Sequence, residues 1–244
     1  MDDDALYFSP AEGFDRLADT YDARLSGSPV LLLETTQTLA ALPNVAGKVV
    51  ADIGCGTGRY AIQLLRFGAR RVAGVDFSPA MLKVAQRKAQ KAELSIEWGV
   101  GDLTEHIPIP DVTLDAAVCA LTLSFVENLN AAFTELARVL KPGGILVTSE
   151  LHPHGLTQER AASAAVFRKD HAPYLRFTDL RGQECRIPRI PHTLSDYVNA
   201  AHAAQLTLTA ASEPLVDSRL AVTFGQLKDQ IGLPLALILK FEKR

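Results

Sequence analysis

Three glycines at alternate positions are the strongest chemical signal in this sequence. They lie in Asp52-Ile-Gly-Cys-Gly-Thr-Gly58, after a β-branched run and directly before a helical pattern over residues 59–67. Glycine lacks a Cβ and tolerates positive φ, so this order brings backbone close to a ligand and leaves helix N–H groups unpaired. A second strand, residues 71–76, ends in Asp76, which would lie beside the turn in a parallel sheet. Because a carboxylate there can accept two ribose hydroxyl hydrogens, the sequence predicts a nucleoside-bearing cofactor.

The elements that must position these residues follow an alternating pattern. Helices are predicted over residues 13–24, 29–42, 59–67 and 130–140, with another starting at Pro79 behind an N-cap Ser78, and strands over 48–53, 71–76, 95–100, 116–122 and 145–150. Residues 206–213 and 234–241 would complete the sheet with a final hairpin. Strands that alternate with helices indicate an α/β fold, a doubly wound and mostly parallel seven-stranded sheet with helices on both faces.

Residues 151–196 break this alternation. The segment is rich in His, Arg and Pro, and its part 176–187 suggests two short strands around Arg181-Gly182. Since it follows the fifth strand, it should lie over the carboxyl edge of the sheet, where open α/β sheets bind ligands. We therefore expect it to cover the substrate.

Composition limits the class of protein. The 244 residues suit one sizeable α/β domain, and 48% hydrophobic and 22% charged residues are ordinary for a soluble chain. The net charge is −3, and the short basic runs 66–71 and 87–91 fit solvated helix surfaces, so no nucleic-acid partner is expected. No apolar run approaches membrane-spanning length, and the acidic start is not a signal peptide.

The cysteines support the same class. Cys55, Cys119 and Cys185 are odd in number and unclustered, which argues for a reducing compartment and against a disulfide or zinc framework. We expect a cytoplasmic protein without membrane association, and a homodimer is possible. No metal site is expected, because a His-x-His pair without carboxylate partners is a weak metal pattern.

Four motifs in order resemble those of class I S-adenosylmethionine-dependent methyltransferases of the small-molecule type. They are Asp52–Gly58, Val75–Leu82, Gly101-Asp-Leu103 and Leu140–Leu146. The glycine spacing is G-x-G-x-G, whereas a dinucleotide site would read G-x-G-x-x-G, which disfavours an NAD-linked oxidoreductase. The resemblance implies a Rossmann-like single domain over 1–244. Its parts would be a helical lid (1–45), a cofactor-binding core (46–150), the cover (151–196) and a C-terminal helix with closing strands (197–244).

The resemblance also implies the cofactor, S-adenosyl-L-methionine, with S-adenosyl-L-homocysteine as product, and a set of residues around it. Asp76 would accept the ribose hydroxyls, Asp102 and Leu103 would read adenine, and Asp52 would orient the loop and the amino group of the cofactor. The full set of expected cofactor-binding residues is Tyr21, Asp52, Gly54, Cys55, Gly56, Gly58, Asp76, Phe77, Met81, Asp102, Leu103 and Ala120.

A purely structural role is open for several of these residues. The glycines could form a tight turn, Asp52 could cap a helix, and Tyr21 could pack its helix against the domain. Phe77 and Met81 could belong to the core, and Cys55 is expected to be packed and not nucleophilic.

Methyl transfer asks the protein mainly to align an acceptor and keep water away, and an acidic acceptor also needs a base. Histidine suits that role at neutral pH. His152, His154 and His192 lie after the fifth strand or in the cover, and we expect at least one to face the acceptor.

The expected function is thus methylation of an oxygen, nitrogen or carbon of a small molecule. No Asn-Pro-Pro-aromatic motif, which many base and glutamine N-methyltransferases carry, is found. The alternative is a protein of the same fold that binds S-adenosylmethionine for another purpose, such as cyclisation or regulation.

Overall fold

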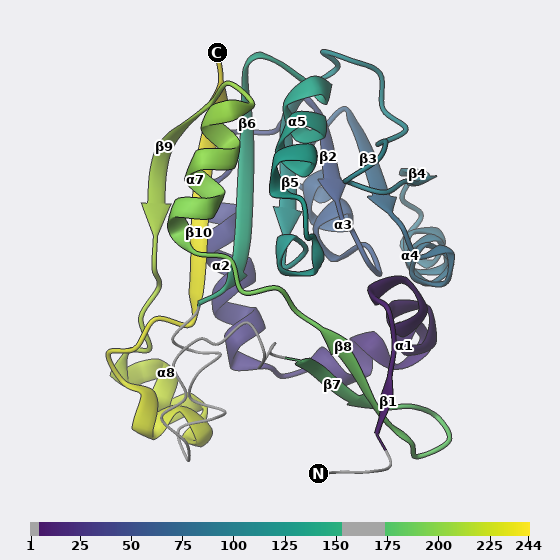
Figure 1. Ribbon diagram of the computed structural model, residues 1–244, viewed down its shortest axis with the longest axis vertical. Coiled ribbons are helices and arrows are strands. Elements are labelled where there is room, and N and C mark those ends of the chain that lie inside the picture. Colours follow the sequence, from purple (N-terminus) through teal and green to yellow (C-terminus); the bar gives the residue numbers. More distant parts are fainter. Residues whose placement is uncertain (1–4, 153–173) are drawn as a thin grey trace.

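A computed structural model describes residues 5–152 and 174–244 (Figure 1). Its main sheet has seven strands in the order β4-β3-β2-β5-β6-β10-β9. These strands are β2 Val49–Ile53, β3 Arg71–Asp76, β4 Glu97–Val100, β5 Leu114–Ala120, β6 Leu140–Leu151, β9 Leu206–Ser212 and β10 Ala236–Lys243. β10 runs antiparallel to both of its neighbours, and the first five strands pair in parallel. The predicted fold class is confirmed.

Helices cover both faces of this sheet. They are α1 Pro10–Leu25, α2 Pro29–Ala41, α3 Arg59–Arg66, α4 Pro79–Lys91, α5 Leu129–Val139, α7 Leu194–Ala203 and α8 Ser218–Thr223, with 3-10 turns η1 Leu123–Phe125 and η2 Gly225–Gln230. Figure 1 shows α5 and α7 on one face, and α2 and α3 on the other. Along β2, Val50 packs with the α3 side, whereas Ala51 and Ile53 pack with α5, as the two-residue period of a strand requires.

Local sequence sets where several helices begin. The Ser78 side chain accepts a hydrogen bond from the N–H of Met81, and Pro79 occupies the first turn of α4, as predicted. α1 begins with a capping box between Ser9 and Glu12. Such caps satisfy helix N–H groups that would otherwise lack partners.

A buried carboxylate fastens α2 to the core. Glu34 is fully buried and accepts a hydrogen bond from the Tyr60 hydroxyl at 2.5 Å and from Thr38 at 3.2 Å. The Ser149 hydroxyl on β6 also donates to it, and Arg59 lies 3.4 Å away. A buried charge is tolerated only when it is paired and hydrogen-bonded in this way.

The predicted cover hairpin is present. β7 Tyr174–Thr178 and β8 Glu184–Pro188 pair antiparallel, and Gly182 in their turn has a φ of 81°. The sequence did not reveal that β1 Leu6–Tyr7 adds to this hairpin in parallel, which makes a second, three-stranded sheet. Figure 1 places this small sheet beside α1, beyond the carboxyl ends of the main strands.

The two predicted closing strands are present. β9 and β10 pair antiparallel, and α8 and η2 lie in the long connection between them. Within the described residues, none of the helices is both long and apolar enough to cross a membrane.

Candidate functional site

A cavity of about 320 Å³ opens at the carboxyl ends of β2, β3, β5 and β6. Open α/β sheets bind ligands at this edge. The residues around it come from the glycine turn, the strand ends, α1, α2, η1 and the cover. They are Phe14, Tyr21, Leu25, Ser28, Val30, Leu31, Gly54, Gly56, Asp76, Phe77, Met81, Ala120, Leu121, Thr122, Ser124, Phe125, Glu150, Leu151, Leu175 and Arg189.

Glycine is needed at the three positions of the turn for different structural reasons. All three have positive φ. A Cβ on Gly54 would lie 2.2 Å from Oγ1 of Thr122, and one on Gly58 would lie 2.8 Å from the Trp98 ring. A Cβ on Gly56 would meet no protein atom within 4 Å, although Gly56 lines the cavity. Gly56 therefore leaves open space for a ligand, whereas Gly58 lies outside the lining and permits helix packing.

Asp76 is held in the cavity wall by both carboxylate oxygens. One accepts the Gly56 N–H at 2.7 Å and the other accepts the Ser78 N–H at 2.9 Å. Burial is the main cause that raises the pKa of Asp76 to about 6, against the lowering effect of these two bonds. Each oxygen has a further lone pair, so the carboxylate can still accept hydroxyl hydrogens from the cavity.

Asp52 lies behind the turn and not in the cavity lining. Its side chain is 1% exposed and accepts the N–H of Ala61 at 2.9 Å. This bond caps α3, whose N-cap residue Gly58 has no side chain to do so. Burial raises the pKa of Asp52 to about 7, and the nearby Arg59 lowers it.

Four of the other expected cofactor contacts line the cavity: Tyr21, Phe77, Met81 and Ala120. Tyr21 reaches it from α1, where it packs edge-on against Phe14 at 6.4 Å between ring centroids. Cys55 is buried, and burial raises the pKa of its thiol well above the ordinary value, so the thiolate is disfavoured.

Asp102 and Leu103 lie beside the cavity but not in its lining. The N–H of Gly101 donates to the carbonyl oxygen of Asp76 at 3.1 Å, which places this segment next to the acidic strand end. The Asp102 carboxylate is exposed and accepts the Thr104 N–H and hydroxyl, both at 2.7 Å. Leu103 is buried. Their adenine-binding role stays a prediction.

The two described histidines of the expected catalytic set also lie outside the lining. His152 is buried, and its Nε2 lies 3.0 Å from the Glu213 carboxylate, toward the β9–β10 connection. Nε2 of His192 donates to the carbonyl oxygen of Val126 at 2.7 Å. His154 lies outside the described residues. The assignment of a base to one of the three stays a prediction.

Two charged cavity residues were not predicted from the sequence. Glu150 is the penultimate residue of β6, and one of its oxygens accepts the Leu123 N–H at 2.6 Å. Arg189 follows β8, and its guanidinium lies 5.4 Å from the centroid of the Phe125 ring. The sequence signal for Glu150 was an acid at the end of a parallel strand, the same signal that identified Asp76.

Helix α1 is bonded to the glycine turn as well as to α4. The Thr57 hydroxyl donates to Asp22 at 2.7 Å, and Lys88 of α4 forms an ion pair with the same carboxylate, also at 2.7 Å. At the other end of α1, Asp15 accepts the Ser78 hydroxyl at 2.6 Å. These contacts hold Tyr21 over the carboxyl edge.

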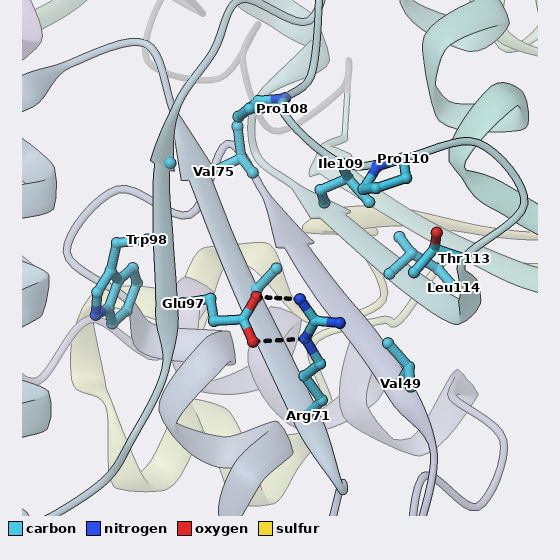
Figure 2. A pocket seen from close by; sticks show the side chains of 12 residues that line it. Val49, Arg71, Val75, Glu97, Trp98, Pro108, Ile109, Pro110, Thr113 and Leu114 are labelled. Carbon is cyan, nitrogen blue, oxygen red and sulfur yellow. Dashed lines mark hydrogen bonds and ion pairs between the residues drawn. The ribbon is translucent and has the colours of Figure 1, made fainter.

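A second hollow, of about 210 Å³, lies at the opposite edge of the sheet (Figure 2). Val49, Arg71, Glu97 and Leu114, the first residues of their strands, line it, and Arg71 forms two hydrogen bonds to Glu97 across β3 and β4. Ala73, Val75 and Gly99 also line it, so it extends along the sheet from these strand starts toward the strand ends. Because the β4–β5 connection contains no helix, only its loop covers this part of the sheet.

Known proteins are similar to this chain over the region that contains the glycine turn and the strand ends. Residues 51–148 match the family described as a methyltransferase domain. A malonyl-(acyl-carrier protein) O-methyltransferase of Yersinia pestis is 35% identical over 142 residues, which cover 58% of this chain and 49% of that protein. A demethylmenaquinone methyltransferase of Tropheryma whipplei is 38% identical over 146 residues, 57% of this chain and 58% of that protein. The chain thus spans about half of the length of these relatives.

Solved structures share the fold over nearly the whole chain. An S-adenosylmethionine-dependent methyltransferase of Mesorhizobium loti has a TM-score of 0.68 at 22% identity, covering 90% of this chain and all of that one. The (4+2)-cyclase SpnF has the same TM-score at 19% identity, covering 96% of this chain and 95% of that one. At such identities the likeness concerns the fold alone. The ordered motifs, the sheet and the matched domain together support a class I S-adenosylmethionine-dependent methyltransferase.

Proposed function

We propose that this protein transfers the methyl group of S-adenosylmethionine to a small-molecule acceptor. The observation that carries the proposal is a single cavity that is lined by two groups of residues. Gly56, Asp76 and Ala120 line it at the strand ends that carry the family motifs, and apolar side chains of α1, α2 and the cover line the rest. The cofactor supplies a methyl group already activated on a sulfonium. The protein then has to bind and orient the two reactants and to exclude water.

The residues at the strand ends fit the cofactor. The open Cβ position of Gly56 gives the backbone room to approach a ligand, and the buried Asp76 carboxylate is oriented to accept hydroxyl hydrogens. We assign the ribose to Asp76, and the adenine to Asp102 and Leu103 beside it. In this proposal Asp52 has an indirect role: its carboxylate caps α3 and so holds the glycine turn in place.

The other part of the cavity fits a small acceptor. We call it the acceptor half, defined by Leu25, Val30, Leu31, Glu150, Leu151, Leu175 and Arg189. Its walls are mostly apolar, and the whole cavity has the size of a small-molecule site. The two named relatives act on malonyl-(acyl-carrier protein) and demethylmenaquinone, so their acceptors differ in chemistry.

The test is transfer of label. Purified protein is incubated with methyl-labelled S-adenosylmethionine and the fraction of a cell extract below about 1 kDa. We expect S-adenosylhomocysteine to form only when that fraction is present, and the label to move into a small organic molecule. The Asp76→Ala variant serves as the control.

Two results would contradict the proposal. Label that enters only protein or nucleic-acid fractions would move the acceptor to another class. Binding of S-adenosylmethionine without any formation of S-adenosylhomocysteine would favour the alternative, use of the bound cofactor in cyclisation or regulation.

A further inference from the structure

Arg189 is the only positively charged side chain among the described residues that line the cavity. Its backbone is fixed, because the N–H of the next residue, Ile190, donates to the Ser124 carbonyl oxygen at 2.7 Å. Its guanidinium lies over the Phe125 ring, at 5.4 Å from the centroid. Arginine stacked on an aromatic ring keeps its planar group oriented. The cover thus presents an oriented cation to the cavity.

The surroundings of Arg189 strengthen its effect on a ligand. Leu25, Leu31, Leu151 and Leu175 line the same cavity. Charges interact more strongly beside apolar walls than in water, because the local dielectric constant is lower. The ligand group that matches a guanidinium there is a planar anion that accepts two parallel hydrogen bonds, and a carboxylate has that shape.

Glu150 also lines the cavity, and its protonation state changes the net charge there. Burial raises the pKa of Glu150 to about 7, and the hydrogen bonds from Leu123 and Ser124 and the charge of Arg189 lower it. Cys119 and Tyr197 also face Glu150, but burial raises their own pKa values, so both stay neutral near pH 7. Asp76 also lines this cavity. Glu150 therefore changes its charge between about pH 6 and pH 8.

We propose that the acceptor of this enzyme carries a carboxylate, which Arg189 binds, and that Glu150 takes up a proton when this acceptor binds. The inference rests on the proposed function and narrows its acceptor class. A neutral acceptor such as a ring hydroxyl cannot form the paired, charge-assisted hydrogen bonds that a carboxylate forms with a guanidinium. The cofactor has a carboxylate of its own at the methionine end, so the test must separate the two.

The test uses octanoate and octanamide, which have the same apolar chain and differ in charge. Binding of each to the protein loaded with S-adenosylhomocysteine is measured by titration calorimetry. We expect octanoate to bind roughly tenfold or more tightly than octanamide, in line with hydrogen bonds to charged groups. Arg189→Gln should remove this preference and Arg189→Lys should keep part of it.

A matched control is Arg181→Gln. Arg181 lies in the turn of the same hairpin, is exposed, and is not part of the cavity lining. It should leave the affinity for octanoate unchanged. All three arginine variants should bind S-adenosylhomocysteine as the wild type does.

Dependence on pH provides a second measurement. Octanoate stays ionised from pH 6 to pH 8, whereas Glu150 loses its proton over that range and then repels the ligand. The affinity of the wild type for octanoate should rise as the pH falls from 8 to 6. Glu150→Gln, which keeps an acceptor for the Leu123 N–H, should bind octanoate equally well at both pH values.

Three results would overturn the inference. Equal binding of octanoate and octanamide to the wild type, or no binding of octanoate, would exclude a carboxylate-selective site. A loss of S-adenosylhomocysteine affinity in Arg189→Gln as large as the loss for octanoate would assign Arg189 to the carboxylate of the cofactor. Wild-type protein that does not bind S-adenosylhomocysteine would instead overturn the proposed function itself.

Discussion

Asp76 connects the glycine turn to the start of α4 through its two oxygens, so one carboxylate fixes both sides of the expected ribose site. Asp102, two residues beyond the end of the neighbouring strand β4, is exposed, and its carboxylate accepts the Thr104 N–H and hydroxyl within its own turn. Loss of Asp76 and loss of Asp102 should therefore lower the affinity for a ligand to different extents.

Asp76→Ala should weaken binding of S-adenosylhomocysteine more than Asp102→Ala. Hydrogen bonds to a charged group contribute about 1.5–3 kcal/mol, which predicts a loss of roughly tenfold or more for Asp76. At the Asp102 position the backbone N–H of Leu103 would remain. Titration calorimetry on variants that retain cooperative thermal unfolding measures both losses, and equal or reversed losses would show that the ribose acid is misassigned.

The pKa of Asp76 also predicts a pH dependence. Because its folded pKa is raised to about 6, the carboxylate is ionised at pH 8 and increasingly protonated below pH 6. Ribose hydroxyls need the ionised form as acceptor, so the affinity for S-adenosylhomocysteine should be nearly constant above pH 7. Below pH 6 it should fall by up to about tenfold per pH unit. Asp76→Asn should show a flatter profile, and a wild-type profile that stays flat to pH 5 would contradict the assignment.

The raised pKa of Asp76 has the opposite pH effect on the stability of the unliganded protein. Folding raises the pKa of Asp76 above its ordinary value, so the folded state binds the proton more tightly than the unfolded chain. The stabilising contribution is complete below about pH 4 and is lost as the pH rises through about 6. Cofactor affinity and the contribution of this residue to stability therefore change in opposite directions over this range.

At the scale of elements, acidic side chains join α1 to the glycine turn and to α4. Asp22 bonds to Thr57 in the glycine turn and to Lys88 on α4, whereas Asp19 pairs with Arg87 in an exposed ion pair. Exposed ion pairs contribute about 0–1 kcal/mol, so the Asp19 contact should matter little. The Asp22 contact joins α1 directly to the glycine turn.

Asp22→Ala should release the lid and Asp19→Ala should not. A lost hydrogen bond of about 0.5–1.5 kcal/mol predicts that Asp22→Ala lowers the affinity for S-adenosylhomocysteine by roughly twofold to tenfold. The effect should be a faster dissociation, measured by stopped-flow fluorescence with the cofactor product. If Asp19→Ala has the same effect, the helix contributes through general packing and not through the Thr57 contact.

At the scale of the whole molecule, the cavity joins parts that are distant in sequence. α1, the strand ends of the main sheet and the three-stranded sheet all contribute to its wall or support it, and Arg16 of α1 forms an ion pair with Asp179 in the hairpin turn at 2.8 Å. A ligand in this cavity should stabilise these parts together, because it binds only the folded state.

S-adenosylhomocysteine at 100 times its dissociation constant should therefore stabilise the fold by about 2.7 kcal/mol. For a chain of this size that corresponds to a rise in Tm of roughly 5–11 °C. Differential scanning calorimetry measures it, and NAD at the same concentration is the control. A shift with NAD and none with S-adenosylhomocysteine would contradict the family cofactor.

Local sequence determined the elements of this protein and the glycine turn beside Asp76. The strand over 71–76 has the predicted bounds, and the Ser78–Pro79 start of α4 and the turn at Gly182 are also as predicted. These features depend on residues close together in the chain: caps, turn glycines and the two-residue period of strands. The order of the motifs predicted the glycine turn beside Asp76, because parallel strands bring their ends to one edge.

Only the tertiary structure decided which side chains line the proposed acceptor half of the cavity. Arg189 and Glu150 meet in one cavity although 38 intervening residues separate them in the chain, and β1 pairs with β8 across most of the chain, Leu6 opposite Cys185. His152 follows Glu150 by two residues, yet its ring lies against Glu213 outside the lining. Which side chain faces a cavity depends on contacts between distant segments, and local patterns carry no information about those contacts.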